Sequence, residues 1–309
     1  MPKDFFALMG LGAVGAPLAN LLYKKYGDQF ILLSSKDFLH TLTDRPIYIN
    51  GELFAPRIVT DKSELKGKIR CLFLCVKNYH VENAVTFLKT IIDDECIIFP
   101  LQNGVYSFDF FLRNFPQNIV LEGFAKGPNT TLCENGFVYQ RPGSFHVGSS
   151  NAKWKDTARS IYNRLIEAGV DCVYDENVTR EVWKKFMLNV AGNAVTALTG
   201  IDYAMFKNAP EAQQVCREVM KEFEVVAGRR GIELGEQEIE EIIRYYLSFT
   251  VSKHTSMLED AINSRRTEND YIAGYISHLA HDLKIATPRI DLLYSLMKIK
   301  ESVYLGKYQ

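Results

Sequence analysis

Three polar side chains at four-residue spacing mark the part of the sequence best suited to chemistry. Lys185, Asn189 and Asn193 stand at i, i+4 and i+8 of the apolar segment 183–195, so in a helix they line one stripe. Asparagine is a poor helix-interior residue and buried amides need hydrogen-bond partners, so the stripe is predicted to face a ligand or a polar domain interface. A lysine there can donate a proton to a developing alkoxide or polarise a carbonyl by its charge. The alternative is a structural network that ties this helix to its neighbours.

A glycine-rich segment near the start of the chain is typical of a phosphate-binding loop. Residues 10–15 directly follow the apolar run 5–9, and Pro17 lies in the first turn of a predicted helix. The glycines permit a tight turn and close approach of a pyrophosphate to the backbone, at a helix N-terminus that favours an anion. We predict that this loop binds a dinucleotide through Gly10, Leu11, Gly12, Ala13, Val14 and Gly15. The alternative is a glycine turn that only packs strand on helix.

The residues after the second predicted strand bear on the choice of cofactor. Enzymes that use NAD place an acidic residue there, on the ribose hydroxyls. This chain has Ser34, Ser35, Lys36 and Asp37 after the run 30–33. Two hydroxyls and a cation accommodate a 2′-phosphate that a carboxylate would repel, so Ser35 and Lys36 predict NADPH. Asp37 at the strand tip, or a solvated Lys36, is the alternative.

The first half of the chain alternates apolar runs with helical periodicity. The near-continuous runs are typical of parallel strands that are covered on both faces, and they lie at 5–9, 30–33, 71–76, 96–101 and 119–121. Helical spacing at 16–26 and 81–92 separates them, which predicts a Rossmann-like, doubly wound parallel sheet. Segment 136–148 contains several turn residues and is predicted to be a hairpin appended to that sheet.

The second half is predicted to be all-helical. One long helix is expected over 177–209, and the further helices are expected over 211–230, 236–248, 256–262, 267–283 and 291–305. The fold class is therefore α/β, with a dinucleotide-binding domain at 1–175 and a helical substrate and catalytic domain at 176–309. At 309 residues the chain is long enough for two domains of ordinary size, each able to bury its own core.

Composition narrows the classes of partner. The 36 Lys and Arg residues are balanced by 37 Asp and Glu residues, which lacks the basic excess of a nucleic-acid binder. Glycines, Pro17 and Asn20 within 5–22 argue against a signal peptide or membrane span. The six cysteines are scattered and His278 and His281 have no evident acidic partner, so no metal site is predicted. We expect a cytoplasmic protein with reduced thiols. Its expected partner is a small molecule rather than a nucleic acid or a membrane. Whether the protein forms a homodimer is left open by the sequence.

Several segments, in this order, resemble the ketopantoate reductase family over most of the chain. They are the loop 10–15, Val76-Lys77, Leu101-Gln102-Asn103-Gly104, the Lys-x3-Asn-x3-Asn helix with 197–200, and 254–274. The resemblance implies that Lys185 is the general acid, that Asn103 lies near the nicotinamide and the substrate, and that Lys77 lines the cofactor cleft. It also implies that Asn189, Asn193 and Ser256 bind the substrate, and that Glu268 contacts the lysine or the cofactor ribose.

The implied activity is NADPH-dependent reduction of 2-dehydropantoate (ketopantoate) to pantoate, for pantothenate and coenzyme A synthesis. Ser256 and Glu268 also have structural explanations, because Ser256-x-x-Glu259 fits a capping box and Thr267 resembles another helix start. The chain departs from the family's usual arginine at the second-strand tip, and Arg266 stands where a proline is common. The alternatives are a reductase of another branched 2-oxo acid and a non-catalytic NADPH-binding regulator.

Overall fold

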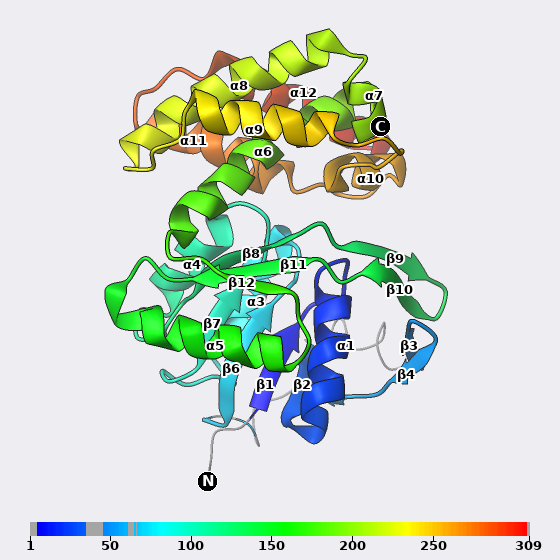
Figure 1. Ribbon diagram of the computed structural model, residues 1–309, viewed down its shortest axis with the longest axis vertical. Helices are drawn as coiled ribbons and strands as arrows, with labels where there is room; N and C mark the ends of the chain where they lie inside the picture. Colours follow the sequence, from blue (N-terminus) through cyan, green and yellow to red (C-terminus); the bar gives the residue numbers. More distant parts are fainter. Residues whose placement is uncertain (1–4, 35–45, 61–64, 66, 308–309) are drawn as a thin grey trace. The chain divides into compact units, whose positions relative to one another are not determined.

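The computed structural model describes residues 5–34, 46–60, 65 and 67–307 of the chain (Figure 1). The chain divides into two compact units, residues 1–179 and residues 180–309. The first unit is an α/β structure and the second is helical, so the predicted fold class is confirmed. Within the described residues no helix is both long and apolar enough to cross a membrane.

The first unit is built on a five-stranded parallel sheet. Its order is β5-β2-β1-β6-β7, formed by Arg57–Val59, Phe30–Leu33, Phe5–Met9, Ile69–Leu74 and Ile97–Pro100. Both faces of β1 and β2 are buried, which is why their sequences are almost continuously apolar. The chain runs from β1 to β2 on one side and returns to β6 on the other, so the order of the strands reverses next to β1. Ligands of open α/β sheets bind at such a reversal, outside the carboxyl ends of the strands.

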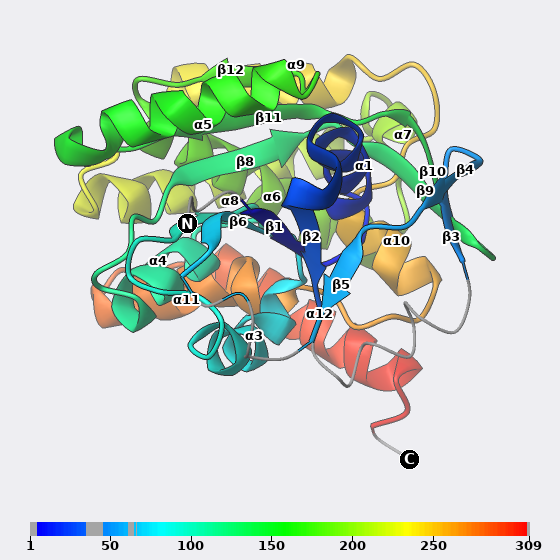
Figure 2. The same cartoon turned by 90° about the horizontal axis from the view of Figure 1, so that it is seen from below.

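Helices cover both faces of this sheet (Figure 2). On one face α1 (Gly15–Tyr26) and α5 (Lys155–Glu167) pack against a core that includes Leu8 and Phe73. On the other face α3 (Val81–Leu88) and α4 (Tyr106–Asn114) pack against a second core. Among the described residues of this unit, single 3-10 turns lie at Gly27–Gln29, Asn78–His80 and Ala152–Trp154.

Two smaller sheets replace the hairpin that was expected over 136–148. One has the order β4-β3-β10-β9, formed by Glu52–Phe54, Ile47–Ile49, Gly136–Arg141 and Asn129–Cys133. The other has the order β12-β11-β8, formed by Cys172–Tyr174, Ser144–Gly148 and Glu122–Lys126. The hairpin prediction is wrong because β10 pairs with the preceding β9, whereas β11 joins β8 in a different sheet. The strand expected at 119–121 is reduced to a single bridge between Val120 and Ile98.

The second unit consists of seven described α-helices and one 3-10 turn. They are α6 (Val178–Thr199), α7 (Tyr203–Phe206), α8 (Pro210–Arg229), α9 (Glu236–Leu247), α10 (Ser256–Ile262), η4 (Asn269–Tyr271), α11 (Ala273–Asp282) and α12 (Pro288–Tyr304). The helix expected over 177–209 is in fact broken, because Gly200 adopts a left-handed φ of 79°. Asp202 then caps α7 by accepting a hydrogen bond from the Met205 N–H at 2.8 Å. The helix expected over 267–283 is likewise divided, into η4 and α11.

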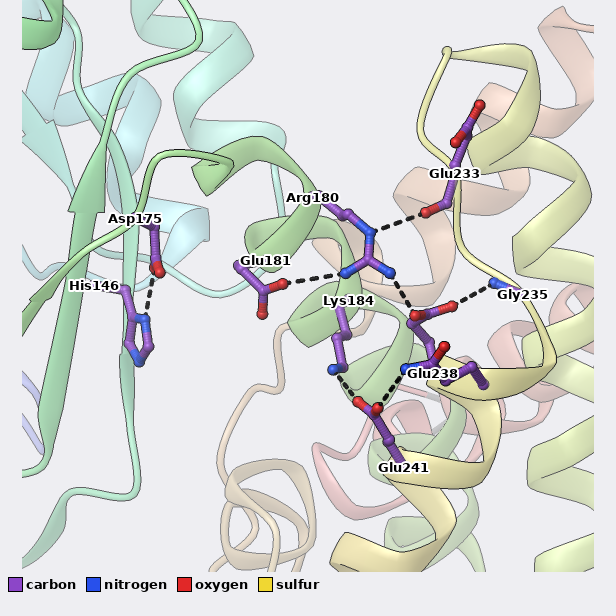
Figure 3. A network of polar contacts seen from close by, with 10 residues as sticks. His146, Asp175, Arg180, Glu181, Lys184, Glu233, Gly235, Glu238 and Glu241 are labelled. Carbon is purple, nitrogen blue, oxygen red and sulfur yellow. Dashed lines mark hydrogen bonds and ion pairs between the residues drawn. The ribbon is translucent and has the colours of Figure 1, made fainter.

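Helix α6 is tied to its neighbours along its length. Near its start, Arg180 and Lys184 form ion pairs with Glu238 and Glu241 of α9 (Figure 3). At its far end, the Lys300 ammonium of α12 donates to the carbonyls of Ala197 and Leu198. A cation at the C-terminal carbonyls complements the helix dipole. These contacts hold the helix that carries the polar stripe.

Candidate active site

The glycine loop contains two glycines that the fold requires and one that leaves space. Gly10 has φ of 103°, and a Cβ there would lie 2.5 Å from the Val76 nitrogen. A Cβ on Gly15 would lie 1.9 Å from the Gly10 carbonyl oxygen. A Cβ on Gly12, by contrast, would meet nothing within 4 Å. Gly10 and Gly15 therefore permit the turn, and Gly12 leaves open the position at which a ligand can approach the backbone.

The helix that follows this loop begins without a side-chain cap. Val14 is the N-cap residue of α1, its side chain makes no capping hydrogen bond, and the first turn holds no acidic residue. An uncapped N-terminus presents N–H groups and the positive end of the helix dipole, which together favour an anion. The open position at Gly12 and this helix end fit the pyrophosphate of a dinucleotide.

Lys77 and Asn103 lie at the same edge of the sheet as the glycine loop. Lys77 follows β6 and Asn103 follows β7, and these two strands are parallel neighbours. The Cys75 N–H donates to the Met9 carbonyl at 2.8 Å, which joins the end of β6 to the end of β1. Both side chains are half-buried. The structure thus brings the loop, Lys77 and Asn103 together at the carboxyl ends of β1, β6 and β7.

Two further amides at this edge were not identified as site residues by sequence reasoning. Asn78 is fully buried and donates to the Asn103 carbonyl at 3.0 Å, so it fixes the two strand-end loops to each other. Gln102 is 6% exposed, and neither atom of its amide has a hydrogen-bond partner among the described residues. Buried amides normally have partners. The only signal for Gln102 in the sequence was its place beside Asn103.

The polar stripe on α6 lies where the helix is otherwise buried. Lys185 is half-buried, and Asn189 and Asn193 are 7% and 3% exposed. The side-chain nitrogens of both asparagines lack hydrogen-bond partners among the described residues. Leaving a buried donor unpaired costs about 1–3 kcal/mol, which a purely structural network would avoid. The ion pairs that join this helix to α9 are made by Arg180 and by Lys184, which is adjacent to Lys185.

Ser256 and Glu268 occupy different environments in the helical unit. Ser256 is exposed at the first position of α10. The capping residue is Thr255, whose hydroxyl accepts from the Leu258 N–H at 3.2 Å, so the capping box expected at Ser256 is wrong by one residue. Thr255 also lies 2.7 Å from the hydroxyl of Thr196, which places the start of α10 beside α6. Glu268 is 6% exposed, immediately before η4.

Two predicted cofactor contacts, Ser35 and Lys36, lie outside the described residues. Among the residues that are described, no group of three His, Cys, Asp or Glu side chains is placed to hold a metal ion. His281 does have an acidic partner, contrary to expectation, because its Nε2 lies 3.1 Å from Asp291. His278 packs edge-on against Tyr294. This pair of histidines is therefore part of the packing between α11 and α12.

The geometry agrees with family models that match both halves of the chain. Residues 6–152 match the ketopantoate reductase PanE/ApbA model, and residues 177–301 match the model of the ketopantoate reductase PanE/ApbA C-terminal domain. The chain belongs to the ketopantoate reductase family. The predicted resemblance is therefore confirmed, and it extends over both the glycine loop and the α6 stripe.

Two curated relatives of this ketopantoate reductase family member are similar to it over nearly their whole length. The 2-dehydropantoate 2-reductase of Streptococcus pyogenes serotype M1 is 23% identical over 305 residues, which cover 96% of this chain and 97% of that protein. The 2-dehydropantoate 2-reductase of Pyrococcus horikoshii is 26% identical over 308 residues, with 96% and 97% covered. The family assignment thus spans nearly the entire sequence.

Solved structures share the fold of this ketopantoate reductase family member. A PanE/ApbA family ketopantoate reductase from Ralstonia eutropha JMP134 superposes with a TM-score of 0.81 at 22% identity, covering 97% of this chain and 99% of that one. A D-mandelate dehydrogenase, solved with NADH and anilino(oxo)acetate, superposes with a TM-score of 0.84 at 22% identity and the same coverage. The same fold is therefore found both in a protein described as a ketopantoate reductase and in one described as a D-mandelate dehydrogenase.

Proposed function

We propose that the protein catalyses the NADPH-dependent reduction of 2-dehydropantoate to pantoate. The observation that carries the proposal is the α6 stripe, in which half-buried Lys185 precedes two buried asparagine amides whose nitrogens lack partners among the described residues. A 2-oxo acid offers acceptors to amide donors at its carboxylate and carbonyl oxygens. A non-catalytic nucleotide-binding regulator has no need of a proton donor on such a stripe.

The proposed residues divide the steps of this reaction between them. The bound dinucleotide supplies a hydride to the substrate's carbonyl carbon. Lys185 donates the proton that the resulting alkoxide oxygen requires. Glu268 orients or reprotonates Lys185 or contacts the cofactor ribose. The hydroxyl and carboxylate ends of the substrate are held by Asn189, Asn193 and Ser256.

The first unit is proposed to hold the cofactor. Gly10, Gly12 and Gly15, with Leu11, Ala13 and Val14 between them, hold the pyrophosphate at the N-terminus of α1. Lys77 lines the cofactor cleft and Asn103 lies near the nicotinamide and the substrate, at the carboxyl ends of β6 and β7. Ser35 and Lys36 hold the 2′-phosphate that distinguishes NADPH from NADH.

A second candidate substrate is another 2-oxo acid on the same scaffold. The similarity in fold to a D-mandelate dehydrogenase supports this alternative. An apolar pocket distinguishes substrates that differ by one methylene by only about 1–3 kcal/mol, so family members can diverge in substrate with few changes.

A substrate panel tests the proposal. Oxidation of NADPH and NADH is followed with 2-dehydropantoate, with branched aliphatic 2-oxo acids and with phenylglyoxylate, and kcat/KM is compared. We expect the highest value for 2-dehydropantoate with NADPH. A higher value for another 2-oxo acid would support the second candidate. Turnover with none of the compounds, from a protein that binds NADPH, would support the regulator and end the enzyme proposal.

We also infer that the protein acts in the cytoplasm on a small molecule, without nucleic acid or membrane as partner. The near-balanced charge supports the part of this inference that concerns nucleic acid. A homodimer is consistent with one structural neighbour, described as a dimeric ketopantoate reductase from Staphylococcus aureus, which superposes with a TM-score of 0.79 at 20% identity. Light scattering of the purified protein measures the mass directly.

A further inference from the structure

A side chain from β9 reaches the glycine loop from far along the sequence. The Thr130 hydroxyl donates a hydrogen bond of 2.8 Å to the backbone carbonyl of Ala13, 117 residues away. Ala13 lies in the middle of the loop 10–15, directly before the N-cap of α1. The contact joins the β9–β10 hairpin to the proposed phosphate-binding backbone.

Pro17 explains why the Ala13 carbonyl takes its donor from outside the helix. The helical hydrogen-bond pattern begins ahead of α1, because the Ala16 N–H donates to the Gly12 carbonyl at 2.9 Å. The next bond in this pattern would run from residue 17 to Ala13. Residue 17 is a proline, which has no N–H, so the helix cannot supply that bond.

We propose that Thr130 is a positioning residue for the glycine loop, and that its hydroxyl replaces the hydrogen bond that Pro17 removes. The Ala13 carbonyl and the Val14 N–H belong to one planar peptide and point in opposite directions. Holding the carbonyl therefore fixes the direction of the Val14 N–H, one of the donors at the uncapped N-terminus of α1. The inference rests on the proposed function for the identity of the anion bound there, the pyrophosphate of NADPH.

The hairpin that carries Thr130 is itself attached to α1. Tyr139 of β10 is the cross-strand partner of Thr130. Its hydroxyl accepts a hydrogen bond of 2.9 Å from the Asn20 amide of α1, and its N–H donates to the Asn50 side chain at 2.8 Å. Thr130 is thus presented to the loop from a hairpin fixed to the same helix, which keeps the geometry of the contact constant.

Three substitutions on β9 test the role of the hydroxyl in the full-length protein. Thr130→Val keeps the shape of the side chain and removes the donor, whereas Thr130→Ser keeps the donor. Thr131→Val is the matched control, because this neighbouring side chain is exposed and lies on the opposite face of the strand. A net hydrogen bond contributes about 0.5–1.5 kcal/mol, so Thr130→Val should raise the Kd for NADPH by about 2–10-fold.

Thr130→Ser and Thr131→Val should bind NADPH as the wild type does. Equal weakening by Thr130→Val and Thr131→Val would overturn the proposal. So would a lower Tm of Thr130→Val with an unchanged Kd, because that pattern describes a contact that stabilises the fold alone.

Pro17→Ala provides a second, independent arm. It restores an N–H at residue 17, so the Ala13 carbonyl regains a donor within the helix. In this background Thr130→Val should change the Kd by less than about twofold, since the two donors substitute for each other. The same fold increase in both backgrounds would overturn the proposal.

A further measurement separates this inference from the proposed function. It is the free energy of unfolding, without ligand, of the wild type, Thr130→Val, Pro17→Ala and the variant that carries both substitutions. If the effects of the two substitutions on the free energy of unfolding are not additive but the protein binds no NADPH, the Thr130 hydroxyl still replaces the hydrogen bond that Pro17 removes. The role of Thr130 in cofactor binding would then be wrong. NADPH binding with additive effects would overturn this inference and leave the proposed reaction intact.

Discussion

Gly192 of α6 and Tyr246 of α9 touch so closely that only glycine fits at position 192. The Tyr246 hydroxyl donates to the Leu188 carbonyl at 2.5 Å, one turn before Gly192. A Cβ on Gly192 would lie 2.3 Å from the Tyr246 oxygen. Burial raises the pKa of Tyr246 well above its ordinary value, so the hydroxyl stays protonated and donates. The glycine between the two asparagines of the stripe therefore serves the packing of α9 on α6.

Gly192→Ala should destabilise the protein although alanine favours helices. The clash and the disturbed hydrogen bond should outweigh the gain in helix propensity and lower the free energy of unfolding by about 1–3 kcal/mol. Gly228→Ala in α8 is the matched control, because its Cβ would meet nothing within 4 Å. This control should be neutral or more stable by up to about 1 kcal/mol. Urea unfolding measures both, and equal effects would contradict the packing argument.

Lys185→Ala tests the proposed proton donor. Turnover should fall by roughly 10²–10⁴-fold, the range typical of a lost general acid, while NADPH affinity changes little because the first unit is proposed to bind the cofactor. Lys184→Ala is the matched control on the same helix, since Lys184 pairs with Glu241. Its turnover per folded molecule should be near normal. Near-normal turnover of Lys185→Ala would end the general-acid assignment.

Lys36→Glu tests the predicted cofactor preference. A carboxylate beside the 2′-phosphate of NADPH adds like-charge repulsion, so the Kd for NADPH should rise. The preference of the wild type for NADPH over NADH should therefore decrease or reverse. Titration of wild type and variant with both cofactors measures this preference. Equal affinity of the wild type for NADPH and NADH would contradict the roles of Ser35 and Lys36.

The Lys184–Glu241 ion pair predicts a pH-dependent contribution to stability. The hydrogen bond from Lys184 lowers the pKa of Glu241 below its ordinary value of 4.5. A depressed pKa in the folded state stabilises the protein above the ordinary value, and this stabilisation is lost as the pH falls through the depressed value.

The stability difference between wild type and Lys184→Met should therefore be constant from neutral pH to about pH 5 and shrink below pH 4.5. Urea midpoints of both proteins across this range measure it. Lys221→Met, whose ammonium lies 3.9 Å from exposed Glu236, is the control and should show a smaller difference at neutral pH. A difference that grows on acidification would contradict the assignment.

The sequence by itself determined the features that depend on local spacing. Four-residue spacing placed Lys185, Asn189 and Asn193 on one face of a helix, because the turn of an α-helix fixes which residues share a face. Near-continuous apolar runs predicted strands buried on both faces, and the glycine pattern after one such run predicted the loop before α1. Family membership followed from these same segments.

The tertiary structure decided what depends on partners distant in sequence. In the structure β10 pairs with β9 rather than with β11. The residue that caps α10 is Thr255, beside Thr196, and not Ser256. The Thr130 hydroxyl donates to the Ala13 carbonyl. A strand's pattern of apolar residues shows which face is buried but not which strand pairs with it. The sequence shows that Pro17 cannot donate a hydrogen bond to the Ala13 carbonyl, but a buried carbonyl can accept from any nearby donor. The sequence therefore does not show that Thr130 supplies it.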